Sequence, residues 1–361
     1  MTALFIVIFA SLLLSIMTVG FISIITSDQQ RSTDDEQSQS AYDAALAGVE
    51  DGKRVLSACQ DGDLAACQAI RRGDCNTVQA SGVEGAPTDD EVVLKSTVFG
   101  DGSQLNQAYT CVVINEDTPD YLATISADES ILVPLRSNQY FSKVAISWYT
   151  EKDAVAPRPV NAIPALPSLS EWLPVGRPPL LRTQLVQYND GTILPSNFDA
   201  NDYAHTLYLY PTTQVSALAF GYDVRRVGSL DLQRARCSDG SFPLLGYACQ
   251  AVIDLPGNNT SFAQRAGFLR LTSIYSGTHV RVQLQNDSGD VVDFAGIQPA
   301  IDSTGRANDL FRRVEARVEN TTPDFPFPRA TIDITNNFCK DFALTEDPVD
   351  YRQNCQADRS G

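Results

Sequence analysis

The stretch SAYDAALAGVEDGKRVL, residues 40–56, determines how this chain begins to fold. Its small and apolar side chains recur every three or four residues, which is the spacing of one face of an α-helix. Charged side chains avoid that face, and the small residues on it let another backbone or a sheet approach closely. We therefore predict an amphipathic helix packed on the chain's own globular part. The predicted contact face consists of Ala41, Ala44, Ala45, Gly48, Val49, Gly52, Val55 and Leu56.

A long apolar run, MTALFIVIFASLLLSIMTVGFISII, precedes this helix. Residues 1–27 contain no charged side chain, and they are long enough for a bilayer crossing, which needs about 20 residues. No proline interrupts residues 1–57, so a single helix of about 85 Å is expected at 1.5 Å per residue, with Gly20 as the point where it would bend. One half of such a helix requires apolar neighbours, and the other half packs on its own domain.

The composition indicates in which compartment the chain folds and which partners it does not bind. The formal net charge is −17, and no run of Lys or Arg occurs. A negative surface repels phosphate, so we expect no binding to nucleic acid and none to anionic lipid. The eight cysteines contain no CxxC pair of the kind that binds zinc. In a chain with an apolar N-terminal segment they predict disulfides formed in an oxidising compartment.

Four cysteines in the N-terminal part allow three pairings. A continuous helix from Cys59 to Cys67 would place their Cα atoms about 12 Å apart, too far for a disulfide. The sequence QDGD between them suggests a turn, which favours this pair and leaves Cys75 for Cys111. The other two pairings remain open. The four remaining cysteines are expected to close two loops, Cys237–Cys249 and Cys339–Cys355.

Most of the chain between residues 107 and 334 has the pattern of β-strands. HVRVQLQ (279–285) and RVEARVE (313–319) alternate apolar and polar side chains, which is the period of a strand. Further apolar runs are separated by turn residues, which indicates an antiparallel β-sandwich of the jelly-roll type. The predicted class is α+β: a long N-terminal helix followed by an antiparallel β-sheet head with an inserted β-sandwich.

The sequence contains no motif of a known catalytic site, and GxSxG, HExxH, GxGxxG and the P-loop are all missing from it. Neither His205 nor His279 has a close carboxylate or thiolate partner in sequence, so we expect no metal site, no cofactor and no enzymatic activity. A binding surface is the stronger candidate, with Trp172, Tyr203 and His205 as a stacking platform for a sugar or protein ligand. Alternatively, Trp172 caps the core of the sandwich.

These features resemble the type IV pilins, and among them the PilX-type minor pilins and related pseudopilins. The resemblance rests on MTALFIVIF…TVGF, on the polar stretch SDQQRSTDDEQSQS and on AYDAALAGVEDGKR, which is similar to the family's A-x-x-A-A-x-x-G-V-E segment. It covers about residues 1–57 and, more loosely, the C-terminal end. In the family a peptidase removes a short basic leader, which implies that Met1 is the mature N-terminus. Phe5 stands where most family members have Glu, which favours a minor or tip subunit.

The resemblance implies that residues 1–57 pack with further copies, or with other pilins, in the core of an extracellular filament and lie in the membrane before assembly. Residues 58–120 and 297–361 would form the pilin head, and 121–296 the inserted sandwich, exposed for adhesion to a host surface or glycan. The alternative is a single-pass membrane-anchored extracellular binding protein that does not polymerise. The expected assembly residues are Met1, Phe5, Ile8, Phe9, Leu13, Gly20 and Phe21.

Overall fold

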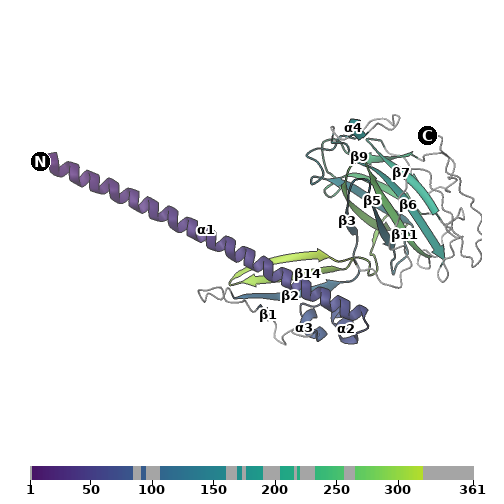
Figure 1. Cartoon of the computed structure of the whole chain (residues 1–361), viewed down its shortest axis with the longest axis horizontal. Helices are drawn as coiled ribbons and strands as arrows, with labels where there is room; N and C mark the ends of the chain where they lie inside the picture. The colour runs from purple at the N-terminus through teal and green to yellow at the C-terminus, as the bar shows by residue number, and fades with distance from the viewer. Residues whose placement is uncertain are drawn as a thin grey trace, which may run out of the picture. The chain divides into compact units, whose positions relative to one another are not determined.

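The computed structural model describes residues 2–83, 91–94, 106–159, 169–172, 176–189, 204–214, 218–219, 232–255 and 265–319. The helix α1 (Thr2–Gln60) is unbroken, so the predicted continuous helix is confirmed, and Gly20 does not interrupt it. At 1.5 Å per residue it is about 88 Å long. Its C-terminal half lies along a small β-sheet, and its N-terminal half extends beyond that sheet (Figure 1).

Four antiparallel strands form this small sheet, in the order β1-β2-β14-β15. All eight residues of the predicted contact face of α1 are buried. Three of them, Val49, Val55 and Leu56, share a hydrophobic core with the sheet residues Tyr109, Val112, Ile114 and Ile301. The predicted amphipathic helix is therefore confirmed, and its partner is this sheet. The strands are β1 (Val92–Val93), β2 (Gln107–Asn115), β14 (Ala300–Ala307) and β15 (Leu310–Arg317).

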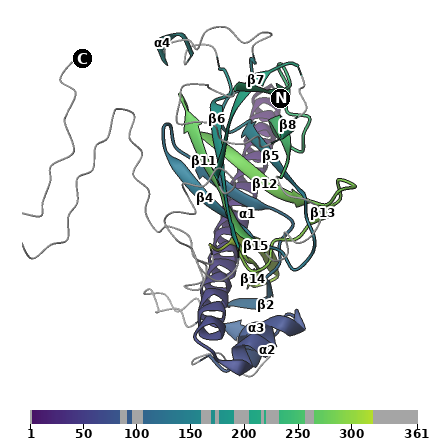
Figure 2. The same cartoon turned by 90° about the vertical axis from the view of Figure 1, so that its right-hand side faces the viewer.

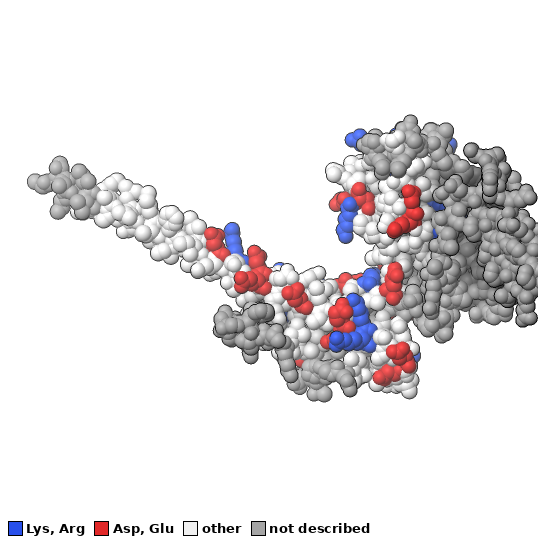
Figure 3. Space-filling model, viewed as in Figure 1, with Lys and Arg blue, Asp and Glu red and all other residues white. Residues whose placement is uncertain are grey.

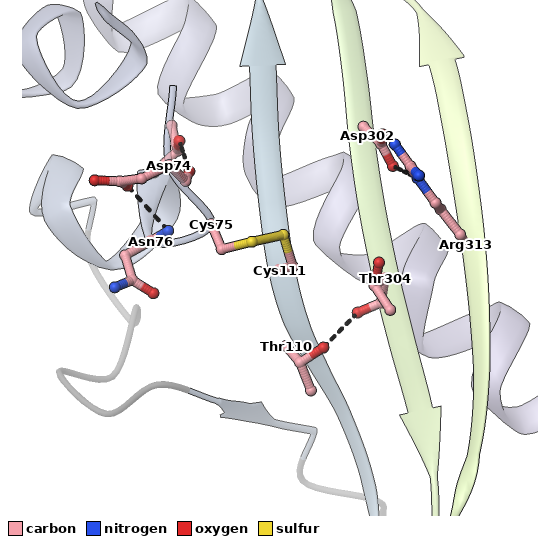
Figure 4. Close-up of a disulfide and its surroundings, with 9 residues drawn as sticks. Asp74, Cys75, Asn76, Thr110, Cys111, Asp302, Thr304 and Arg313 are labelled. Atoms are coloured by element: carbon pink, nitrogen blue, oxygen red, sulfur yellow. Dashed lines mark hydrogen bonds and ion pairs between the residues drawn. A yellow bond between two sulfur atoms is a disulfide. The ribbon is translucent and has the colours of Figure 1, made fainter. Parts of the chain in front are cut away.

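The opposite face of the small sheet carries an ion pair, on side chains that point away from α1 because successive strand residues point to opposite sides. The Arg313 Nε donates hydrogen bonds to both carboxylate oxygens of Asp302, at 2.7 and 2.8 Å. Beside them, the Thr110 hydroxyl donates to the Thr304 carbonyl at 3.4 Å. Figure 4 shows these side chains on the side of the sheet that faces away from α1.

Two short helices follow α1, namely α2 (Leu64–Arg72) and α3 (Thr77–Ser81). The Asp63 carboxylate caps α2 by accepting a hydrogen bond from the Ala65 N–H at 2.8 Å. Gly73 ends α2 in the left-handed conformation, with φ at 63°, which a residue without Cβ adopts at little cost. The chain therefore turns between Cys59 and Cys67, as the sequence suggested.

The six described cysteines form three disulfides. Cys59 pairs with Cys67 at a Cα–Cα distance of 4.7 Å, and Cys75 pairs with Cys111 (Figure 4). These are the two pairings that the spacing favoured. The third disulfide, Cys237–Cys249, closes its expected loop, whereas Cys339 and Cys355 lie outside the described residues. The disulfides indicate an oxidising, extracytoplasmic compartment.

Eleven strands form a large sheet, whose main path is β13-β12-β5-β10-β9-β7-β6-β11-β4 (Figure 2). In addition, β3 pairs with β12 and β8 pairs with β10. The strands are β3 (Tyr121–Ile125), β4 (Ser130–Leu135), β5 (Lys143–Thr150), β6 (Leu180–Asn189), β7 (Ala204–Thr212), β8 (Leu218–Ala219), β9 (Leu232–Cys237), β10 (Tyr247–Asp254), β11 (Arg265–Ile274), β12 (Thr278–Gln285) and β13 (Val291–Val292).

This large sheet differs from the expected antiparallel sandwich. It is one continuous, barrel-like sheet, and it is mixed, because β7 pairs with β9 in parallel and β8 pairs with β10 in parallel. A parallel pair requires a crossover of a dozen or more residues. The chain between Thr212 and Leu232 is long enough to provide one. The α+β class holds in its coarse form, since a long helix precedes a mostly β remainder.

One hydrophobic cluster fills the interior of the large sheet. The alternation predicted for β12 is confirmed, because Val280, Val282 and Leu284 all belong to this cluster. The same cluster contains Trp148, whose indole N–H donates to the Pro179 carbonyl at 3.2 Å. Strands β2 and β14 of the small sheet pair directly although β3 to β13 lie between them in sequence. The large sheet is thus inserted between two halves of the small one.

Candidate assembly surface

The first half of α1 is apolar and exposed. Its large side chains between residues 8 and 25 are 44–69% exposed, and Figure 3 shows this part of the helix free of charged side chains. The helix is long and apolar enough to cross a membrane. An apolar surface of this size is unfavourable in water and indicates a missing apolar partner. The side chains are Ile8, Phe9, Leu12, Leu13, Leu14, Ile16, Met17, Val19, Phe21, Ile22, Ile24 and Ile25.

Four hydroxyl groups in this half bond to the helix itself. Ser11 donates to the Ile8 carbonyl at 2.9 Å, and Ser15 donates to the Ser11 carbonyl at the same distance. Thr18 and Thr26 bond to carbonyls one turn earlier. Because these four hydroxyls are satisfied locally, they can enter an apolar environment without being left unpaired.

A band of charge marks the end of the apolar half. Asp28, Arg31 and residues 34–36, which are Asp, Asp and Glu, are all exposed. Figure 3 shows this band on the helix between the apolar half and the small sheet. Charged side chains stay in water or at a polar boundary because their burial is costly. The band therefore limits the apolar environment to the residues that precede it.

The second half of α1 packs on the small sheet at backbone distance. A Cβ added to Gly52 would lie 2.7 Å from Cγ2 of Ile301, and one added to Gly48 would overlap the Ser303 hydroxyl. A Cβ on Gly305 of β14 would overlap the backbone of Ala41 and Ala45. At these three positions a side chain on the glycine would overlap its neighbours, so the close packing of α1 on the sheet depends on glycine there.

Polar contacts further fix the helix on the sheet. The Tyr109 hydroxyl donates to the Asp51 carboxylate at 2.7 Å. Burial, followed by this hydrogen bond to a carboxylate, raises the pKa of Tyr109 well above its ordinary value, so the phenol stays protonated as a donor. Arg312 of β15 donates to the Ser38 hydroxyl at 2.6 and 2.9 Å. These partners are distant in sequence, and no local pattern predicts them.

The sequence-derived assembly residues fall into two groups. Ile8, Phe9, Leu13 and Phe21 are exposed on the apolar half of α1, and a Cβ added to Gly20 would meet nothing within 4 Å. Met1 and the side chain of Phe5 lie outside the described residues. In the described part of this surface, the apolar side chains are therefore exposed all around the helix.

The expected ligand platform needs a correction. Leu207 and Leu209 of β7 belong to the interior cluster of the large sheet. His205 points to the same side, because alternate strand residues share a face, and it is 2% exposed. Tyr208 and Tyr210 point to the outer side. His205 is therefore an interior residue and offers no surface to a ligand, and Tyr203 lies outside the described residues.

Trp172 lies on the outer side of the large sheet, at the end of the short helix α4 (Leu169–Trp172). Its ring stacks on Tyr275 at 4.6 Å and meets Tyr210 edge-on at 5.8 Å. It is 1% exposed and forms a separate cluster with Leu180 and Tyr210. Trp172 and His205 are thus on opposite faces of one sheet and share no platform. Trp172 is buried, as the alternative interpretation expected, but in a cluster separate from the interior one.

Within the described residues, no group of three or more His, Cys, Asp or Glu side chains is placed to hold a metal ion. Comparisons with protein-family models, with curated proteins and with solved structures found no match for this chain. The feature that points to a function is therefore α1, a continuous helix with an exposed apolar half.

Proposed function

We propose that this protein is a structural subunit of an extracellular, type IV pilus-like filament. In this proposal the apolar half of α1 is the assembly element and packs against the same segment of other copies or of related subunits. Before assembly the segment lies in the membrane. The large sheet is carried on the outside of the filament, where it is available for adhesion or contact with a surface.

The continuity of α1 is the observation that supports assembly over simple anchoring. A membrane anchor needs about 20 apolar residues and any connection to its domain. A filament subunit must hold its domain at a fixed place relative to the packed segment. The unbroken helix provides this relation, because its second half contacts β14 at Gly305 at backbone distance while its first half is apolar and exposed.

A pair of substitutions tests the proposal. Phe9 is 69% exposed on the apolar half of α1, and Leu64 is 76% exposed on α2. A charged side chain in an apolar environment costs about 2.5–3.5 kcal/mol, and each 1.4 kcal/mol is about tenfold in an equilibrium constant. We expect Phe9→Asp to lower the amount of protein in filaments sheared from cells by about a hundredfold.

Leu64→Asp is the matched control, because it replaces an exposed apolar side chain with the same residue outside the assembly element. We expect this variant to enter sheared filaments at the level of the unchanged chain. Immunoblots measure the amount of each variant in whole cells, in membranes and in sheared filaments. Normal incorporation of Phe9→Asp into filaments would reject the assembly role of the apolar half of α1. Absence of the unchanged chain from sheared filaments, with the chain found only in membranes, would leave the membrane-anchored monomer as the better account.

A further inference from the structure

The chain passes twice between the small and the large sheet. The first crossing, residues 116–120, connects β2 to β3, and the second, residues 293–299, connects β13 to β14. Two such crossings are either flexible linkers or a junction, meaning segments held together by their own hydrogen bonds. The contacts of residues 116–120 and 293–299 show which of the two they are.

The two crossings pair with each other. The Phe294 N–H donates to the Thr118 carbonyl at 2.8 Å, and the Thr118 N–H donates back to the Phe294 carbonyl at 3.2 Å. The Thr118 hydroxyl also donates to the Gln298 carbonyl at 3.2 Å. Thr118 and Phe294 are 1% and 0% exposed. The crossings are therefore joined by one buried antiparallel bridge between Thr118 and Phe294.

Gln298 connects the end of the second crossing to the large sheet. Its side-chain oxygen accepts from the Leu122 N–H at 2.9 Å, and its side-chain nitrogen donates to the Leu122 carbonyl at 2.8 Å. Gln298 is 3% exposed and stands two residues before β14 of the small sheet, whereas Leu122 belongs to β3 of the large one. The oxygen and the nitrogen of the buried Gln298 amide are thus both bonded to one residue of the large sheet. These two bonds fix the distance between the second crossing and β3.

A second set of contacts joins the end of β15 to the start of β3. Arg317 of the small sheet lies 3.2 Å from the Asp120 carboxylate. The Tyr121 hydroxyl donates to the Glu319 carboxylate at 2.8 Å, while the Tyr121 ring belongs to the core of the large sheet. Both contacts include a charged group, and hydrogen bonds to charged groups are stronger than those between neutral groups.

From these contacts we infer that the small sheet with its helix and the large sheet unfold as one cooperative unit. Domains joined by flexible linkers open independently, whereas parts that share buried hydrogen bonds open together. This inference concerns the folding of the chain itself and is independent of whether it enters a filament. If it does, a load on the large sheet reaches α1 through the junction.

Hydrogen exchange with mass spectrometry on the full-length chain in detergent tests the inference. Peptides from β14 report the small sheet, and peptides from β5 report the large one. In the unchanged chain we expect both to lose protection at the same urea concentration. In Gln298→Ala we expect the two transitions to separate by about 0.5 M or more.

Two further variants make the outcome clear. Gln250→Ala removes a glutamine side chain of β10 that bonds Ser147 within the large sheet, and it should leave the transitions coincident. Tyr121→Phe removes the contact to Glu319 but keeps the ring, so it serves where Gln298→Ala does not fold, and a smaller separation is expected. Separate transitions in the unchanged chain would overturn the inference. Coincident transitions in both junction variants would overturn the claim that the junction contacts couple the two sheets.

Discussion

At Gly305 the backbone of β14 lies directly against the backbone of α1. The pairing register between β2 and β14 shifts between Thr304 and Gly305, and a Cβ at position 305 would overlap main-chain atoms of Ala41 and Ala45. Main-chain atoms in a packed helix move only with the whole element. One residue without a side chain therefore sets how close the helix lies to the sheet.

We predict that Gly305→Ala lowers the free energy of unfolding by about 1–3 kcal/mol, the usual cost of overfilling a packed contact. Gly20→Ala is the control on α1, where an added Cβ meets nothing within 4 Å. Alanine favours a helix over glycine by about 1 kcal/mol, so this control should not destabilise. Urea unfolding of both variants measures the difference, and equal stabilities would show that the contact at Gly305 is loose.

Asp120 gives a prediction for pH. Burial raises the pKa of its carboxyl above the ordinary 3.8, although Arg317 and Arg281 act in the opposite direction. The folded chain then binds this proton more tightly than the unfolded chain does. The resulting contribution to stability is fully present below pH 3.8 and is lost as pH rises through the folded-state pKa.

In Asp120→Asn this contribution is missing. We therefore expect the unchanged chain to gain stability relative to Asp120→Asn as the pH falls from neutral to below 3.8. Urea unfolding across that range measures the difference, with the exposed Asp61→Asn as a control that should show a smaller trend. A difference that does not vary with pH, or that has the opposite sign, would contradict the role of burial at Asp120.

At the scale of elements, the disulfides differ in what they hold. Cys59–Cys67 closes a separation of 8 residues at the turn after α1, whereas Cys75–Cys111 closes one of 36 and ties the segment between α2 and α3 to β2. A disulfide stabilises mainly by restricting the unfolded chain, and the effect grows with the size of the closed loop.

We predict that replacing Cys75 and Cys111 by serine lowers the free energy of unfolding by about 3–4 kcal/mol, and that replacing Cys59 and Cys67 lowers it by about 2–3 kcal/mol. The reason is the longer loop that Cys75–Cys111 closes. Denaturant unfolding under non-reducing conditions gives both values. A larger loss for the Cys59–Cys67 pair would show that native contacts of the turn, rather than loop size, dominate.

Local patterns predicted the elements whose contacts are local. The helix period of residues 40–56 gave all eight buried positions of the contact face, and the period of two in HVRVQLQ gave the core residues of β12. The sequence QDGD, with its glycine, indicated the turn that Cys59–Cys67 requires. In each case the signal lies within a single helix, strand or turn.

Long-range pairing was beyond such patterns. The parallel pairing of β7 and β9 depends on a crossover connection. The alternation of apolar and polar residues in a strand does not indicate which other strand it pairs with. The same applies to Trp172 and His205, which the sequence placed in one platform although the sheet holds them on opposite faces. Of the assembly surface, the apolar segment was predicted, whereas Tyr109, Gly305 and Arg312, which fix α1 in place, come from distant strands.

At the scale of the described molecule, α1 has two environments in one helix. Its second half is covered by the chain's own small sheet, and its first half has no apolar neighbour within the described residues. The satisfied hydroxyls and the charged band after residue 27 fit an apolar environment of limited length. In the proposed filament, other copies provide that environment, whereas lipid provides it for a membrane-anchored monomer.

The most direct measurement is therefore chemical cross-linking between copies through α1. Ile16 is 62% exposed in the middle of the apolar half, and Ile16→Cys places a single added thiol there. A short cross-linker with a maleimide at one end and a photoreactive group at the other is applied to filaments sheared from cells, with the chain lacking the added cysteine as background control. The account predicts linked dimers of this chain, or its links to related subunits, in the sheared fraction. Filaments that contain the variant without such links, or a variant found only in membranes as an unlinked monomer, would contradict it.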